Sequence, residues 1–124
     1  MIEFPDIDEI QDMLEEISET IPKDFFDRLN EGVVLLPERK LHSKSRRDRP
    51  LYVLGEYRKS ITGSHIRIYY GSFKRVMEGF EIEEIKEKLR DTLLHEFTHH
   101  LETLAGERGL ILKDQESLRK YLGK

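Results

Sequence analysis

Apolar residues recur at three- and four-residue steps in two segments of the chain, and this spacing predicts two amphipathic helices. The first helix follows Asp6, its predicted N-cap, with Glu9 as the capping-box partner, and it ends near Pro22. The second is longer and runs from Glu81 to about Ala105. Its core positions form one stripe along the helix: Ile82, Ile85, Leu89, Leu93, Phe97, Leu101 and Leu104. We therefore expect the second helix to be the central helix of the fold.

Between these helices the pattern changes to that of β-strands. A short helix is predicted over residues 22–32, and the apolar run 33–36 predicts a buried strand. Residues 51–58 and 65–70 are rich in strand-forming types, and turn residues at Thr62-Gly63 predict that they form a hairpin. A last short helix is expected to start with Asp114 as its N-cap. These elements predict one α+β domain over residues 1–124, with a small sheet of about three strands packed on helices.

Composition narrows the chemistry and the location of the protein. The chain has no cysteine, which excludes a disulfide framework and a thiolate zinc site, so histidine and carboxylate must hold any metal. No run approaches the 18 or so apolar residues of a membrane span, and the acidic start, MIEFPDIDEI, does not resemble a signal peptide. We expect a cytoplasmic protein without a membrane partner.

Residues 37–50, PERKLHSKSRRDRP, form a basic segment bounded by prolines and without periodicity. It could contact phosphate or nucleic acid, or it could be a solvated loop. No aromatic residue interleaves with its charges to stack on bases, so we expect a solvated loop and no nucleic-acid partner.

One motif in the second helix indicates a specific chemistry. His95-Glu96-Phe97-Thr98-His99 reads H-E-x-x-H, and two histidines four residues apart lie one turn apart on one helix face. Two imidazoles so placed can bind one zinc ion, and the glutamate can accept a proton from the water that zinc activates. His95 and His99 fall opposite the apolar stripe, whereas His100 lies close to it. We predict His95 and His99 as ligands, Glu96 as the general base, and His100 as a structural hydrogen-bonding residue.

The third protein ligand of the zinc is left open between two carboxylates. Glu102 shares the helix face of His95 and His99, and Asp114 follows the glycines at which the chain could turn back over the metal. We favour Asp114 and keep Glu102 as the alternative. Tyr69, Tyr70 and His65 are candidates to hydrogen-bond the reacting oxygen, although the alternation of strand residues also places Tyr70 in the core.

The sequence around the motif resembles the small bacterial zincin-like metallopeptidases. The resemblance rests on DTLLHEFTHHLETLAGERGL and extends upstream to VVLLPERKLH, LYVLGEY and IRIYYGSF. It implies a compact α+β zincin fold, zinc on His95 and His99, and Glu96 as general base. Many members continue H-E-x-x-H-H-F-G and soon place an aspartate as third ligand. This chain has Leu101-Glu102 there, and its acidic segment around Asp114 comes later.

The sequence therefore predicts a zinc-dependent peptidase that acts on a peptide or protein substrate. The strand over residues 65–70 is a candidate edge for pairing with an extended substrate. Two other functions stay open: a non-catalytic metal-binding or regulatory module, and a metal-dependent nuclease that uses the basic segment. The substrate and the oligomeric state are not indicated by the sequence.

Overall fold

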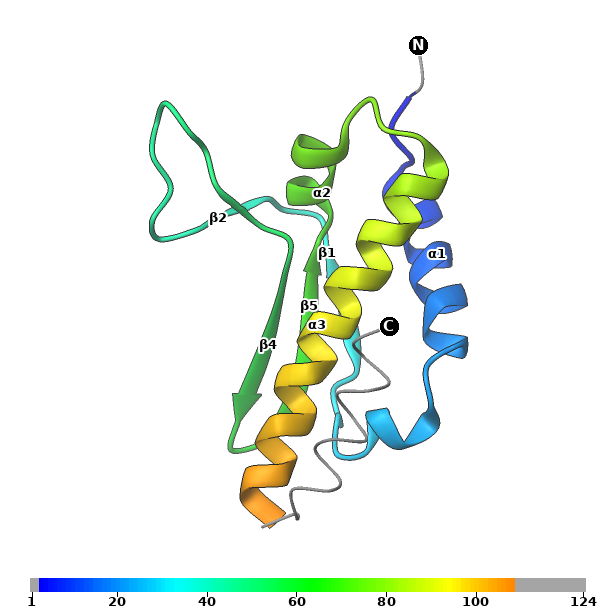
Figure 1. Cartoon of the computed structure of the whole chain (residues 1–124), viewed down its shortest axis with the longest axis vertical. Helices are drawn as coiled ribbons and strands as arrows, with labels where there is room; N and C mark the ends of the chain where they lie inside the picture. Colours follow the sequence, from blue (N-terminus) through cyan, green and yellow to red (C-terminus); the bar gives the residue numbers. More distant parts are fainter. Residues whose placement is uncertain (1–2, 109–124) are drawn as a thin grey trace.

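The structure is a computed structural model, and it describes residues 3–108 of the chain. The predicted α+β class is confirmed, with a small sheet beside helices (Figure 1). The helices are α1 (Ile7–Glu19), the 3-10 helix η1 (Lys23–Phe26), α2 (Tyr70–Met77) and α3 (Ile82–Arg108). The strands are β1 (Val33–Leu36), β2 (Lys40–Leu41), β3 (Tyr52–Val53), β4 (Gly55–Ser60) and β5 (Gly63–Tyr69).

The main sheet has the order β1-β5-β4, so β5 is its central strand. Strand β5 pairs in parallel with β1, where Leu35 lies opposite Ile68, and antiparallel with β4, where Tyr57 lies opposite Ile66. The predicted hairpin is confirmed as β4–β5. The prediction that residues 65–70 form a free edge is wrong, because β5 has a partner on each side. Strand β4 is the edge strand next to α3, and β2 and β3 form a separate two-stranded sheet.

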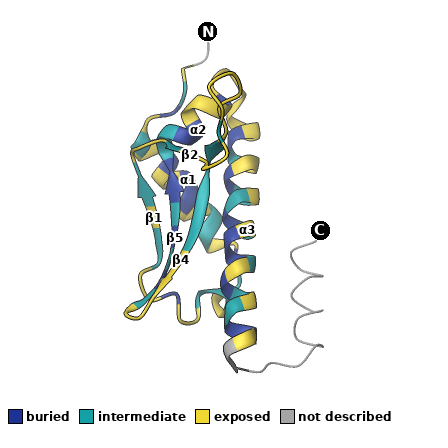
Figure 2. Cartoon of the chain, turned by 90° about the vertical axis from the view of Figure 1, so that its left-hand side faces the viewer, coloured by how far each residue is buried: buried dark blue, intermediate teal, exposed yellow. Residues whose placement is uncertain are grey.

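The two long helices form where the periodicity predicts them. The capping box is present at α1, because the Glu9 backbone N–H donates to Asp6 and the Asp6 backbone N–H donates to Glu9. The buried stripe of α3 packs on α1 and on the inner face of the sheet (Figure 2). The fully buried core side chains come from α1, β5, α2 and α3: Ile10, Ile66, Ile68, Phe73, Ile85, Leu89, Leu93 and Phe97. This packing leaves the opposite side of α3 in contact with solvent.

Several local predictions differ from the structure. The helix predicted over residues 22–32 is only η1, which ends where Asp27 adopts a non-helical ψ of 127°, and Arg28 beyond it has a positive φ of 62°. Strand β1 is half-buried rather than fully buried, since it forms the other edge of the sheet. Helix α2 was not predicted. The predicted helix at Asp114 lies outside the described residues. Within residues 3–108, no helix is both long enough and apolar enough to cross a membrane.

Candidate metal centre

His95 and His99 project from the exposed side of α3, as their position opposite the apolar stripe predicts. Their Nε2 atoms lie 3.2 Å apart, and their rings meet edge to face with centroids 4.7 Å apart. A tetrahedral zinc ion with Zn–N bonds of about 2.0–2.1 Å holds two nitrogen ligands about 3.3 Å apart. The two imidazoles therefore already have the separation that one zinc ion requires.

Glu96 lies between the two histidines in the sequence but points toward the sheet. Its side chain is buried, with 7% of its surface exposed, on the side of α3 that faces β4. Burial raises the pKa of Glu96 above its ordinary value of 4.5. The positive charge that His95 and His99 can carry and the nearby Tyr57 backbone N–H act to lower this pKa, so they oppose the effect of burial. Burial is the larger effect, and the pKa of the Glu96 carboxyl is raised overall.

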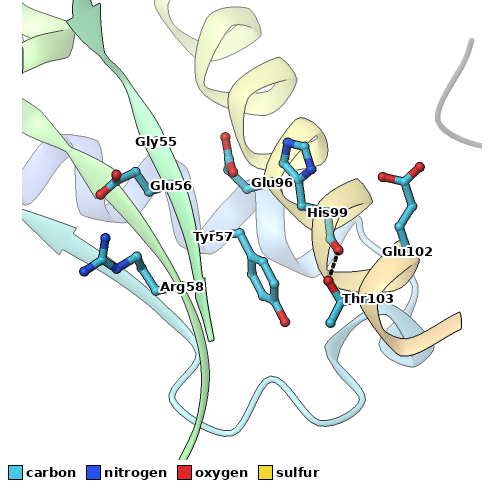
Figure 3. Close-up of a pocket in the computed structure, with 8 residues that line it drawn as sticks. All are labelled: Gly55, Glu56, Tyr57, Arg58, Glu96, His99, Glu102 and Thr103. Carbon is cyan, nitrogen blue, oxygen red and sulfur yellow. Dashed lines mark hydrogen bonds between the residues drawn. The ribbon is translucent and has the colours of Figure 1, made fainter. Parts of the chain in front are cut away.

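A cleft of about 670 Å³ separates α3 from β4 at this point. Glu96, His99, Glu102 and Thr103 line it from the helix, and residues 55–58 line it from the strand (Figure 3). A second hollow of about 420 Å³ contains His95 and shares Gly55 and Glu96 with the first. The two hollows meet at Glu96, so the buried carboxyl lies along one groove between the helix and the free edge of β4.

Gly55 allows the strand to approach the helix this closely. A Cβ atom at Gly55 would lie 2.9 Å from Cγ2 of Thr92, which is one turn before Glu96 on α3. It would also lie 3.3 Å from the backbone oxygen of Arg67 on β5. A larger residue would require the Thr92 methyl group, or the backbone around it, to move. The missing side chain therefore allows the close approach of β4 to α3 beside Glu96.

His100 has a structural role, as predicted, and its side chain is fully buried. Its Nε2 lies 2.7 Å from the backbone oxygen of Asp27, and its Nδ1 lies 2.8 Å from the hydroxyl of Tyr57. Burial lowers the pKa of His100, which favours the neutral ring. A carbonyl oxygen can only accept, so Nε2 carries the proton. The Tyr57 hydroxyl lies beside Nδ1 and also has Ser64 Oγ at 3.1 Å as a second hydrogen-bond partner. His100 thereby connects α3 to β4 and to the segment after η1.

Comparisons with known proteins bear on the family but not on an activity. No family model matches the chain, and no curated protein matches it. A solved structure of a conserved hypothetical protein from Thermo thermophilus has 34% sequence identity and a TM-score of 0.68 to the chain. The match covers 82% of this chain and 99% of that one. The chain belongs to the family of that protein. The description of this relative specifies no function.

Within residues 3–108, no group of three or more histidine or acidic side chains is arranged to hold a metal, so the predicted third ligand is not identified there. Glu102 is exposed and lines the same cleft as His99, but it does not complete such a group with the two histidines. Asp114, the favoured candidate, lies outside the described residues and stays a prediction. The histidine pair and Glu96 are therefore the part of the site that the described residues contain.

The structure does not bring the other candidate polar residues to the groove. The Tyr69 hydroxyl donates to Glu56 at 2.6 Å, and the Tyr70 hydroxyl donates to the backbone oxygen of Pro5 at 2.7 Å. His65 lies between Glu31 and Arg67, and none of these three candidates lines either hollow. Two other tyrosines, Tyr52 and Tyr57, line the groove instead. Their position follows from β3 and β4 lying beside α3, which sequence spacing alone does not indicate.

Proposed function

We propose that the protein is a zinc-dependent metallopeptidase in which His95 and His99 bind the metal and Glu96 is the general base. The observation that carries this proposal is the 3.2 Å separation of the two Nε2 atoms beside a buried carboxyl in an open groove. If His95 and His99 were only solvated surface residues, nothing would require their imidazoles to lie at this separation or next to a buried acid. Asp114 remains the proposed third ligand, with Glu102 as the alternative.

Each side chain of the site has a distinct role in the proposed hydrolysis. When bound, zinc supplies a Lewis acid that activates water and polarises the carbonyl of the scissile bond. Glu96 accepts the proton from the attacking water and delivers it to the leaving amine. Burial raises the pKa of Glu96 above that of an exposed glutamate. A carboxyl that must first accept a proton and then donate it works better when its pKa is closer to neutrality.

The strand beside the groove supports a polypeptide as the substrate. Within residues 3–108, strand β4 pairs with β5 along one side only, and its other side faces Glu96 and His99. A free strand edge pairs with an extended polypeptide through backbone N–H and C=O groups, so it does not depend on one particular side chain. We therefore assign the role of substrate-pairing edge to β4, in place of the strand over residues 65–70.

The proposal is tested by comparing the wild-type protein with Glu96→Gln in zinc binding and in hydrolysis of an unfolded protein substrate. Glu96→Gln should bind zinc as tightly as the wild type and lose about 100-fold or more of the turnover, the usual contribution of a general base. His95→Ala should lose both zinc and activity. Thr103→Ser, which changes the cleft wall but not the proposed chemistry, is the matched control. Equal turnover by the wild type and Glu96→Gln would refute the proposed role of Glu96.

The third ligand is tested separately by zinc titration against a competing chelator. Asp114→Asn should weaken zinc binding at least about 100-fold, which is the upper range for loss of a residue that only supports a ligand. Glu102→Gln should leave the affinity within a few fold of the wild type. The reverse result would assign the ligand to Glu102. If both substitutions release zinc, the metal has four protein ligands and the site is a closed, non-catalytic one.

A further inference from the structure

The loop over residues 42–50, here called the basic arm, extends away from the sheet and the helices (Figure 1). It connects β2 to β3, and its four basic side chains are all exposed: Lys44, Arg46, Arg47 and Arg49. The only ion pair formed by these four within the described residues joins Arg46 to Asp48, at 3.5 Å and with both side chains about 70% exposed. Such an exposed pair contributes little. The arm therefore presents positive charge that the described part of the protein does not neutralise.

Hydrogen bonds within the arm give it a defined shape. The His42 backbone N–H donates to Leu51 O at 2.8 Å, and the Leu51 backbone N–H donates to Ser45 Oγ at 2.9 Å. At the tip, the Arg49 backbone N–H donates to Arg46 O at 3.1 Å. The basic side chains are thus carried by a closed turn, so binding a ligand does not require the whole loop to be ordered first.

The arm differs in charge from the rest of the protein. It carries four basic residues and one acidic residue, a net charge of +3, whereas the whole chain carries −4, so the remaining residues together carry −7. Helix α1 alone contains six acidic residues and no basic one. An acidic ligand is therefore attracted to the arm and repelled by most of the remaining surface, which fixes where such a ligand can bind.

The arm is continuous with the proposed active site. His42, at its base, and Tyr52 on β3 line the hollow that also contains His95 and Glu96. Lys88 on α3 lines the same hollow and adds a positive charge there, although Asp91 is also present. A polypeptide lying in the groove along β4 and extending past His95 would reach the base of the arm.

We propose that the basic arm binds an acidic stretch of the polypeptide substrate, on the His95 side of the scissile bond. This inference rests on the proposed peptidase function, and it adds a substrate preference that the metal site itself does not provide. Glu96 and Glu102 line the catalytic cleft and would repel acidic residues there. The acidic residues of the substrate therefore lie outside the cleft. They contact Lys44, Arg47 and Arg49 on the arm.

The surroundings of the arm favour a polypeptide over a nucleic acid as the ligand. No phenylalanine, tyrosine or tryptophan lies within residues 42–50 to stack on bases, and the −7 charge of the remaining residues opposes a long, densely charged polyanion. The free edge of β4 next to the arm offers backbone pairing, which suits a polypeptide. A polypeptide with one acidic block on an otherwise neutral chain could bind the basic arm through that block and pair with β4 through its backbone.

The experiment measures binding by fluorescence anisotropy in the zinc-loaded Glu96→Gln background, so that no chemistry is required. The probes are a peptide with a block of glutamates at one end, the same peptide with glutamines in the block, and a single-stranded RNA of equal charge. Arg47→Gln with Arg49→Gln should weaken binding of the acidic peptide roughly 3- to 30-fold. The glutamine peptide should bind more weakly and be unaffected by the substitutions. Raising the salt to about 1 M, where the Debye length is about 3 Å, should remove the preference.

The matched control removes two positive charges elsewhere. Lys23→Gln with Arg28→Gln changes the net charge equally, but these exposed residues lie at and just after η1, at the opposite end of the molecule (Figure 1). The control should keep the affinity for the acidic peptide. Equal weakening by both pairs of substitutions, or equal binding of the two peptides, would overturn the proposal. Tighter binding of the RNA than of the acidic peptide would also overturn it, and would assign the basic arm a nucleic-acid ligand. If the wild type binds the acidic peptide but does not hydrolyse it, the proposed peptidase activity is refuted and the proposed binding by the basic arm stands.

Discussion

Alanine substitutions at the neighbouring histidines His99 and His100 should have opposite effects on zinc binding and on folding. His99 is exposed, and its imidazole contacts the Nε2 of His95. His99→Ala should therefore abolish zinc binding and change the free energy of unfolding of the zinc-free protein by no more than about 0.5 kcal/mol. His100→Ala should keep zinc binding, because His95 and His99 are unchanged, but it removes a fully buried ring and should destabilise the fold.

The cost of His100→Ala can be worked out from its two contacts. The substitution leaves the backbone oxygen of Asp27 without its 2.7 Å partner, whereas the Tyr57 hydroxyl loses the 2.8 Å contact with His100 but keeps Ser64 Oγ at 3.1 Å. A buried polar group left unpaired costs about 1–3 kcal/mol, and the cavity left by the ring adds to this cost. We expect about 3–5 kcal/mol in total, which is a large part of the 5–15 kcal/mol stability of a typical domain.

The assay is urea unfolding in the presence of a chelator, because bound metal would stabilise the folded state and mask the comparison. With a typical slope of about 1–3 kcal/mol per molar urea, His100→Ala should lower the midpoint by about 2 M. His100→Phe, which keeps the ring volume without the nitrogens, separates the hydrogen bonds from the packing. Equal midpoints for His99→Ala and His100→Ala would refute the division of roles between the two sides of α3.

Three further substitutions test the fold around the site. Gly55→Ala should destabilise the protein by about 1–3 kcal/mol in thermal unfolding, because the new Cβ would lie 2.9 Å from Thr92. Although burial acts to raise it, hydrogen bonds from Lys40 and Tyr69 hold the pKa of Glu56 below 4.5, so its contribution to stability is lost as the pH falls below that value. Glu56→Gln should thus flatten the loss of stability between about pH 5 and pH 3. Asp6→Ala should lower the free energy of unfolding, measured in urea, by about 1 kcal/mol, as loss of an N-cap does.

Features that depend on neighbours in the sequence were predictable. The capping box at Asp6, the β4–β5 hairpin and the orientation of His95 and His99 all follow from local spacing. His100 could be assigned to the buried side because one residue rotates the helix by about 100°. These features require only the helical and strand repeats and the chemistry of turns and caps.

Features that depend on distant pairing were not predictable. Strand β1 pairs with β5 across 33 positions, since Val33 lies opposite Ile66, and this pairing makes β5 central and β4 the edge. Nothing in the spacing of either strand specifies that partner. Helix α2 was missed because Tyr69-Tyr70 continues a strand-like pattern into it. The role of Gly55 appears only when β4 is placed against Thr92.

The division of α3 into a buried side and an exposed side also bears on how such proteins diverge. The residues that hold the helix in place, such as Leu93 and His100, are separate from the exposed residues that would hold the metal. A descendant that loses His95 or His99 keeps its core and its hydrogen bonds, and so remains a folded protein. A variant of this fold without the histidine pair would thus keep its groove, and it would still offer a surface for binding another protein.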